Sequence, residues 1–128
     1  MQKVIVMANK EEHIEKALLI GGPILCLLLF MIDNNPSMFL LTVLLSLGML
    51  VLGAVLPDIL EPPTNPFHRS TFHSKLILII VGSLGIISII ITFLVIANWI
   101  TLSLCGLFIG YVIHLAQDSQ TRIGLPDF

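Results

Sequence analysis

Histidine and carboxylate side chains that can bind a divalent ion recur in separate stretches of this chain. One precedes the first apolar segment. Others lie in LPDILEPPTNPFHRSTFHS, residues 56–74, and in GYVIHLAQDSQT, residues 110–121. The candidate metal ligands are His13, Asp58, His68, His73, His114 and Asp118. Imidazole nitrogen and carboxylate oxygen are ligands that Zn²⁺ prefers. A metal site is therefore predicted if folding brings these stretches together.

The last stretch places two of these residues four apart, on one face of an expected helix. His114 and Asp118 continue a stripe that begins with Gly106 and Gly110. Because glycines four apart let another helix approach closely, we expect close helix packing along this stripe. A His/Asp pair one turn apart can share a metal ion or simply form a hydrogen bond, and the spacing alone leaves both open.

The composition requires a membrane to position these residues. The chain has 128 residues, of which 56% are hydrophobic and 11% charged, whereas soluble domains have about 25% charged residues. About 20 apolar residues cross a bilayer. We therefore predict an all-α membrane protein, a single integral-membrane domain over residues 1–128 with four transmembrane helices. The expected spans are roughly residues 10–32, 38–56, 75–97 and 100–117.

The charges predict the orientation of these spans in the cell membrane. All six Lys and Arg residues, all four histidines and every carboxylate except Asp33 fall on one side of the four spans. By the positive-inside rule, both termini and the connection between the second and third helices are cytoplasmic. That connection is rich in proline and is expected to be stiff. The net charge is −2. No basic patch is large enough for nucleic acid, so no nucleic-acid partner is expected.

The histidines need particular local structures if they are to converge. His68 and His73 are five residues apart, so they meet only if His68 is in the loop and His73 in the first helical turn. Ser74 is the expected N-cap of that helix. For His13 alone, a solvated histidine at the membrane surface is the ordinary outcome. Ionisable groups at membrane depth are costly and usually functional, so the whole set favours a metal site.

Three sequence boxes resemble one family. LPDILEPP, HRSTFHS and GYVIHLAQDSQTRIGLP are similar to the membrane-bound, metal-dependent hydrolases of the LexA-regulated YdjM type, whose pattern has a PD-acidic stretch, an HRxxTHS box and a GYxxHxxxDxxTxxGxP ending. The resemblance implies a multi-pass hydrolase with a divalent metal. The chain departs from the pattern at Leu60 and Glu61, where the family has a second Asp and a His, and at Phe72, which replaces the box threonine.

The expected activity is hydrolysis of a phospholipid or another ester or phosphoester at the cytoplasmic membrane surface. The ligands favour Zn²⁺, with Mn²⁺ and Fe²⁺ as alternatives. A bound ion would activate water. Glu61 is the candidate general base, and Arg69 is expected to contact the substrate phosphate. Membrane lipid is the expected partner.

Two other classes of protein remain open. A metal-ion transporter or a metal sensor can also carry HxxxD on a membrane helix, but transport sites usually lie near the bilayer midplane. Here the ionisable residues cluster at the ends of the spans, which favours surface chemistry. A small structural protein with a stabilising zinc ion is the third alternative.

Overall fold

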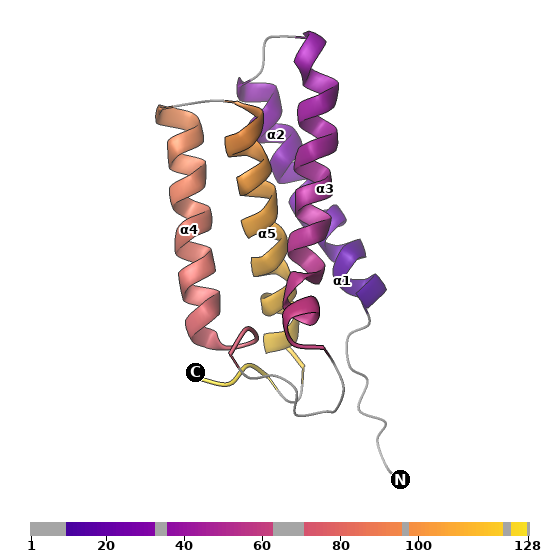
Figure 1. Cartoon of the computed structure of the whole chain (residues 1–128), viewed down its shortest axis with the longest axis vertical. Helices are drawn as coiled ribbons and strands as arrows, with labels where there is room; N and C mark the ends of the chain where they lie inside the picture. Colours follow the sequence, from indigo (N-terminus) through magenta and orange to yellow (C-terminus); the bar gives the residue numbers. More distant parts are fainter. Residues whose placement is uncertain (1–9, 33–35, 63–70, 96–97, 122–123, 128) are drawn as a thin grey trace.

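The computed structural model describes residues 10–32, 36–62, 71–95, 98–121 and 124–127, and these form a bundle of helices (Figure 1). The elements in chain order are α1 (Lys10–Lys16), a π-helical turn η1 (Ala17–Gly21), α2 (Gly22–Ile32), α3 (Pro36–Leu60), α4 (Lys75–Leu94) and α5 (Trp99–Ser119). No strand occurs in these parts of the chain. The predicted all-α class is confirmed.

Four helical segments are long and apolar enough to cross a membrane: Lys10–Met31, Met38–Leu60, Lys75–Leu94 and Trp99–Ser119. Each has at least the 20 residues that roughly 30 Å of hydrocarbon requires. The chain therefore has the helices of a multi-pass membrane protein. Most of the predicted proline-rich connection, including Pro63 and Pro66, lies outside the described residues.

The second membrane helix extends further than the sequence predicted. α3 continues to Leu60, past Pro57, instead of ending near residue 56. Pro57 lacks the N–H that an interior helical residue donates, but its carbonyl still accepts from the Glu61 N–H at 2.8 Å. Asp58 consequently lies on the last turn of α3, in a fixed helical position and not in a loop.

The first membrane helix changes its hydrogen-bond pattern where the sequence places Gly21, Gly22 and Pro23. Residues 17–21 form the π-helical turn η1, and α2 follows from Gly22. Because Pro23 has no N–H to donate one turn back, regular α-helical bonding cannot continue through this point. Gly21 lies against Leu50 of α3, so the same turn also brings the first helix close to α3.

The closest helix pair is α3 and α5, which run parallel (Figure 1). A side chain on Gly110 would collide with the backbone of Leu50 and Ala54, and one on Gly106 with the backbone of Ser46. Gly53 of α3 leaves equal room for the backbone of α5. The predicted close approach along the glycine stripe of α5 is confirmed, and α3 is the helix that uses it.

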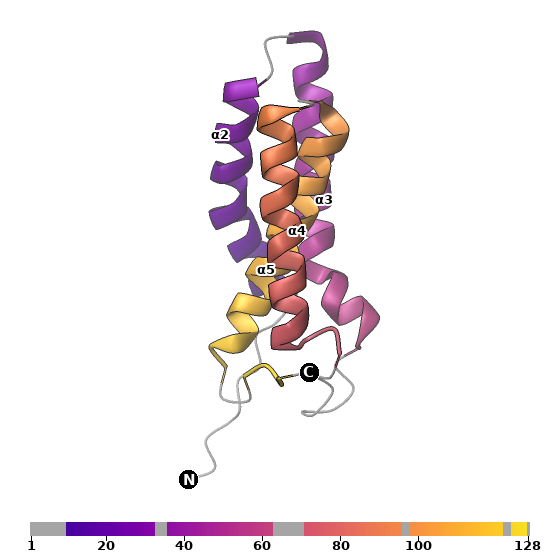
Figure 2. The same cartoon turned by 90° about the vertical axis from the view of Figure 1, so that its left-hand side faces the viewer.

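The remaining helices surround this pair unequally. α4 lies along α5 on the side away from α3, while α1 and α2 lie on another side of the pair (Figures 1 and 2). α4 meets α5 through small residues: Ser88 and Thr92 lie 3.4 and 3.5 Å from the Cys105 Sγ. The start of α1, the end of α3, the start of α4 and the end of α5 all lie at one end of the bundle (Figure 1).

Candidate metal centre

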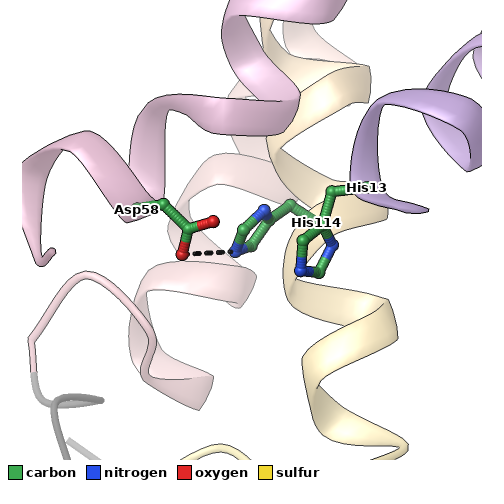
Figure 3. Close-up of side chains that lie close together, drawn as sticks. All are labelled: His13, Asp58 and His114. Atoms are coloured by element: carbon green, nitrogen blue, oxygen red, sulfur yellow. Dashed lines mark ion pairs between the residues drawn. The ribbon is translucent and has the colours of Figure 1, made fainter. Parts of the chain in front are cut away.

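Six of the eight predicted site residues come together at this end of the bundle. They are His13 of α1, Asp58 of α3, Glu61 directly after α3, His73 in the turn before α4, and His114 and Asp118 of α5. Figure 3 shows three of them converging from three helices. His68 and Arg69 lie outside the described residues, so their predicted roles stay predictions.

The contact between α3 and α5 positions His114. Gly106 faces Ser46 and Gly110 faces Leu50. One helical turn further on, the His114 Nδ1–H donates a hydrogen bond of 2.6 Å to the Ala54 carbonyl. A carbonyl oxygen can only accept, so Nδ1 carries the proton and Nε2 faces the centre.

His73 is held in a similar way from the opposite side. Its Nδ1 lies 3.0 Å from Glu61 Oε2, a carboxylate oxygen that accepts the Nδ1–H. The turn that carries His73 is fixed by the Tyr111 hydroxyl, which donates to the Phe72 carbonyl at 3.1 Å. Ser74 is the N-cap of α4, as predicted, and accepts from the Ile77 N–H. His73 therefore precedes the helix and does not lie in its first turn.

Four donor atoms lie close together. They are His73 Nε2, His114 Nε2, Asp58 Oδ1 and Asp118 Oδ2. The two nitrogens are 3.2 Å apart. From His73 Nε2, the oxygens of Asp58 and Asp118 lie at 3.4 and 3.6 Å, and from His114 Nε2 at 3.7 and 3.3 Å. A tetrahedral ion with bonds of about 2.0–2.1 Å separates its donors by about 3.3–3.4 Å. This buried His/Asp cluster can hold a metal ion.

His13 lies beside this set and is buried, with 2% exposure. Its ring stacks on His114, with the ring centres 3.8 Å apart. The expected outcome for this residue considered alone, a solvated surface histidine, is therefore wrong, because α1 packs its first turns against α3 and α5. His13 also forms a second group with Asp58 and His114 whose donor atoms can hold an ion.

The carboxylates differ in their access to solvent. The side chain of Asp118 is 2% exposed, whereas those of Asp58 and Glu61 retain 19% and 11%. Burial disfavours a charged His73, but its hydrogen bonds to Asp58 and Glu61 and the charge of Asp118 outweigh burial and raise the pKa of His73. In the metal-free protein a proton can thus occupy His73 Nε2, where a metal would otherwise bind.

Three contacts of this centre were missed by reasoning from the sequence: the Ala54 carbonyl, the Tyr111 hydroxyl and the buried Gln117 side chain. The Ala54 carbonyl is a backbone group, and its role cannot be predicted from the type of residue. The other two carried a usable signal, because Tyr111 and Gln117 are polar residues in the half of an apolar helix that also carries His114 and Asp118.

Comparison of the chain with family models, with curated proteins and with solved structures finds no match in any of the three.

Proposed function

We propose that this protein is a metal-dependent hydrolase of the membrane, acting at the cytoplasmic surface on a phospholipid or another ester or phosphoester. The observation that supports this most is the buried set of His73, His114 and Asp118, three donors from two distant parts of the chain within bonding reach of one ion. Two histidines and a carboxylate form a common ligand set of hydrolytic zinc sites, which keep a further position for water or substrate.

Asp58 is the donor that would make the site catalytic and not merely structural. Its side chain is the most exposed of the four donors, at 19%, so it is the one that water can reach most easily. A bound divalent ion supplies Lewis-acid chemistry, activating water and polarising the ester oxygen. In this proposal the Asp58 carboxylate orients the attacking water and takes up its proton.

Glu61 receives a positioning role in place of the base role expected from the sequence. Its Oε2 accepts the Nδ1–H of His73, which directs Nε2 toward the centre and makes the ring a better ligand. The contact occupies one carboxylate oxygen, so Asp58 is the better candidate for the base. Arg69 keeps its proposed contact with the substrate phosphate, a role that suits a guanidinium.

The donors favour Zn²⁺ among the divalent ions. Two imidazole nitrogens and the Asp118 carboxylate, with a further position left for water, suit zinc, and Mn²⁺ or Fe²⁺ would add oxygen ligands. Measuring the affinity of purified protein for each ion in turn distinguishes these possibilities.

The position of the centre supports surface chemistry over transport. The ligands come from the ends of α3 and α5 and from the starts of the first and third membrane helices, whereas transport sites usually lie near the midplane. A cytoplasmic orientation rests on the distribution of Lys and Arg, and the hydrolase class is further supported by the resemblance to the YdjM-type family. A lipid headgroup is the substrate group found at that depth.

The decisive experiment measures metal and hydrolysis on the same preparations. Wild-type protein in detergent is assayed for bound metal and for hydrolysis of phospholipid vesicles and soluble phosphoesters, beside His73→Ala and His114→Ala. We expect both variants to lose most of the metal and all of the activity. Full metal occupancy in both would refute the site. Flux of metal into sealed vesicles that these variants abolish, with no hydrolysis by wild type, would favour a transporter instead.

A further inference from the structure

The side of the centre formed by His13 contains buried polar atoms that the four-donor set does not use. His13 Nδ1 has no hydrogen-bond partner in the described part of the chain, and neither does the Nε2 or Oε1 of Gln117. His13 is 2% and Gln117 7% exposed. A buried polar group without a partner costs about 1–3 kcal/mol. The two side chains lie beside each other, so Gln117 can hold His13 Nδ1 and direct Nε2 toward the centre.

Asp118 connects this place to the first ion. One oxygen, Oδ2, faces His73 and His114 at 3.6 and 3.3 Å. The other, Oδ1, faces His13 Nε2 at 3.8 Å. That distance is too long for a hydrogen bond, but two donors of one ion can be separated by nearly that much. A carboxylate with its oxygens directed at different histidines has the arrangement of a bridge between two ions.

The three described histidines are oriented in the same way. In His114 and His73, Nε2 faces the centre and Nδ1 is held by an acceptor, the Ala54 carbonyl or the Glu61 carboxylate. His13 likewise turns Nε2 toward a carboxylate of the centre. The Gln117 amide lies beside the His13 ring without forming a well-aligned hydrogen bond. A small rotation of this amide would let Oε1 accept the His13 Nδ1–H, so that His13 would be held as His73 and His114 are.

We propose that this face binds a second divalent ion through His13 Nε2, Asp118 Oδ1 and one oxygen of Asp58, whose other oxygen keeps the base role, with Gln117 as the residue that positions His13. Asp58 belongs because its donor atom lies within 4.8 Å of those of His13 and His114. The two ions would be about 3.5–4 Å apart, the separation of two-metal hydrolytic sites. One imidazole and two carboxylates form an oxygen-rich set that suits Mn²⁺ as well as Zn²⁺.

This inference rests on the proposed metal centre and adds a substrate preference to it. Two ions at this spacing hold both the attacking and the leaving oxygen of an in-line displacement. Their charge also favours an anionic group. The proposal therefore assigns a phosphate ester, and not a carboxylic ester, as the substrate class.

The test counts ions directly. Wild-type protein is equilibrated with Mn²⁺ alone, its bound metal is determined by elemental analysis, and its electron paramagnetic resonance spectrum is recorded. We expect two ions per chain at saturation and the spectrum of a spin-coupled pair. His13→Gln, His13→Ala and Gln117→Leu should retain one tightly bound ion and give the spectrum of isolated Mn²⁺. Gln117→Leu is expected to weaken the second ion by about 10- to 100-fold, the usual effect of losing a residue that orients a ligand.

Two further variants test whether the effect of Gln117→Leu comes from losing the contact with His13 or from changing any amide on this helix. Gln117→Glu supplies a stronger acceptor for the His13 Nδ1–H and should restore or tighten the second ion. Gln120→Leu changes an exposed amide three residues further on and should bind two ions, as wild type does.

The possible failures are distinct. One ion in saturated wild type, or two ions in both His13 variants, overturns the second site while leaving the first site and hydrolysis standing. Failure of the proposed function gives a different pattern, in which His73→Ala and His114→Ala keep their metal.

Discussion

Gly110→Ala tests whether the packing of α3 on α5 positions the metal ligands. An added Cβ would lie 2.9 Å from the Ala54 nitrogen and still closer to the Leu50 carbonyl oxygen. Carbon atoms normally keep about 3.5–4.0 Å from their neighbours. The two backbones must therefore separate locally by at least about 0.5–1 Å, because neither contact involves a flexible side chain.

The displacement acts one turn from the ligands. The hydrogen bond from His114 Nδ1 to the Ala54 carbonyl would lengthen from 2.6 Å to about 3.1–3.6 Å, at or beyond the limit of about 3.2 Å for such a bond. Losing this orienting contact should weaken metal binding by about 10- to 100-fold. Overpacking should also destabilise the metal-free protein by about 1–3 kcal/mol.

Metal affinity is measured by competition with a chromogenic chelator, and stability by thermal unfolding of metal-free protein in the same detergent. Gly48→Ala is the matched control, since a side chain there meets nothing within 4 Å on the same helix pair, and it should bind metal like wild type. Folded Gly110→Ala protein with wild-type affinity would refute the link between packing and site geometry.

Three further predictions concern the turn that carries His73. Glu61→Gln keeps an acceptor for the His73 Nδ1–H but removes the charge, so metal affinity or turnover should fall by about 10- to 100-fold, and an unchanged value of both would mean that Glu61 is only a loop carboxylate. Tyr111→Phe removes the hydroxyl that holds the Phe72 carbonyl. We expect the stability to fall by about 0.6 kcal/mol, typical of one hydrogen bond between membrane helices, and metal binding to weaken. A metal affinity equal to that of wild type would contradict the role of Tyr111 in positioning His73. The raised pKa of His73 predicts that the stability of the metal-free protein is highest below about pH 6.5, the ordinary histidine value, and declines as pH rises through the raised pKa. Metal affinity should increase over the same interval, because the ion must displace the proton. Melting curves of metal-free wild type and His73→Ala, recorded from below pH 6.5 to above the decline, check this prediction, and parallel curves would refute it.

The fold class could be predicted from the sequence because a membrane leaves few choices. Apolar stretches of 20 residues cross it as helices, and Ser74 and Asn98 cap α4 and α5 as polar residues at such ends usually do. The end of α3 was harder to predict. A proline usually stops a helix, and nothing local indicates that the helix continues through Pro57 to carry Asp58.

The candidate ligands were predictable by type, but their contacts were not. His114 and Asp118 share a helix face by spacing alone. That Ala54 would present its carbonyl to His114 depends on the register of two parallel helices, which glycines allow but do not specify. The burial of His13 depends on where α1 packs, a long-range property that no local pattern in residues 10–16 contains.

The one-sided distribution of donors has a mechanical consequence. The two groups of donors that can hold an ion draw on α1, α3, α5 and the turn before α4, so one ion or a pair ties together every membrane-crossing segment at a single end. α4 otherwise packs chiefly on α5. The opposite end, where α2 and α4 end and α3 and α5 begin, has no such fastening among the described residues. Binding at 100 times the dissociation constant adds about 2.7 kcal/mol of stability, and this gain should stabilise the end of the bundle that carries the donors more than the opposite end. Metal-free protein would then be loosest, and most open to proteases, at the end of the bundle that carries the ligands.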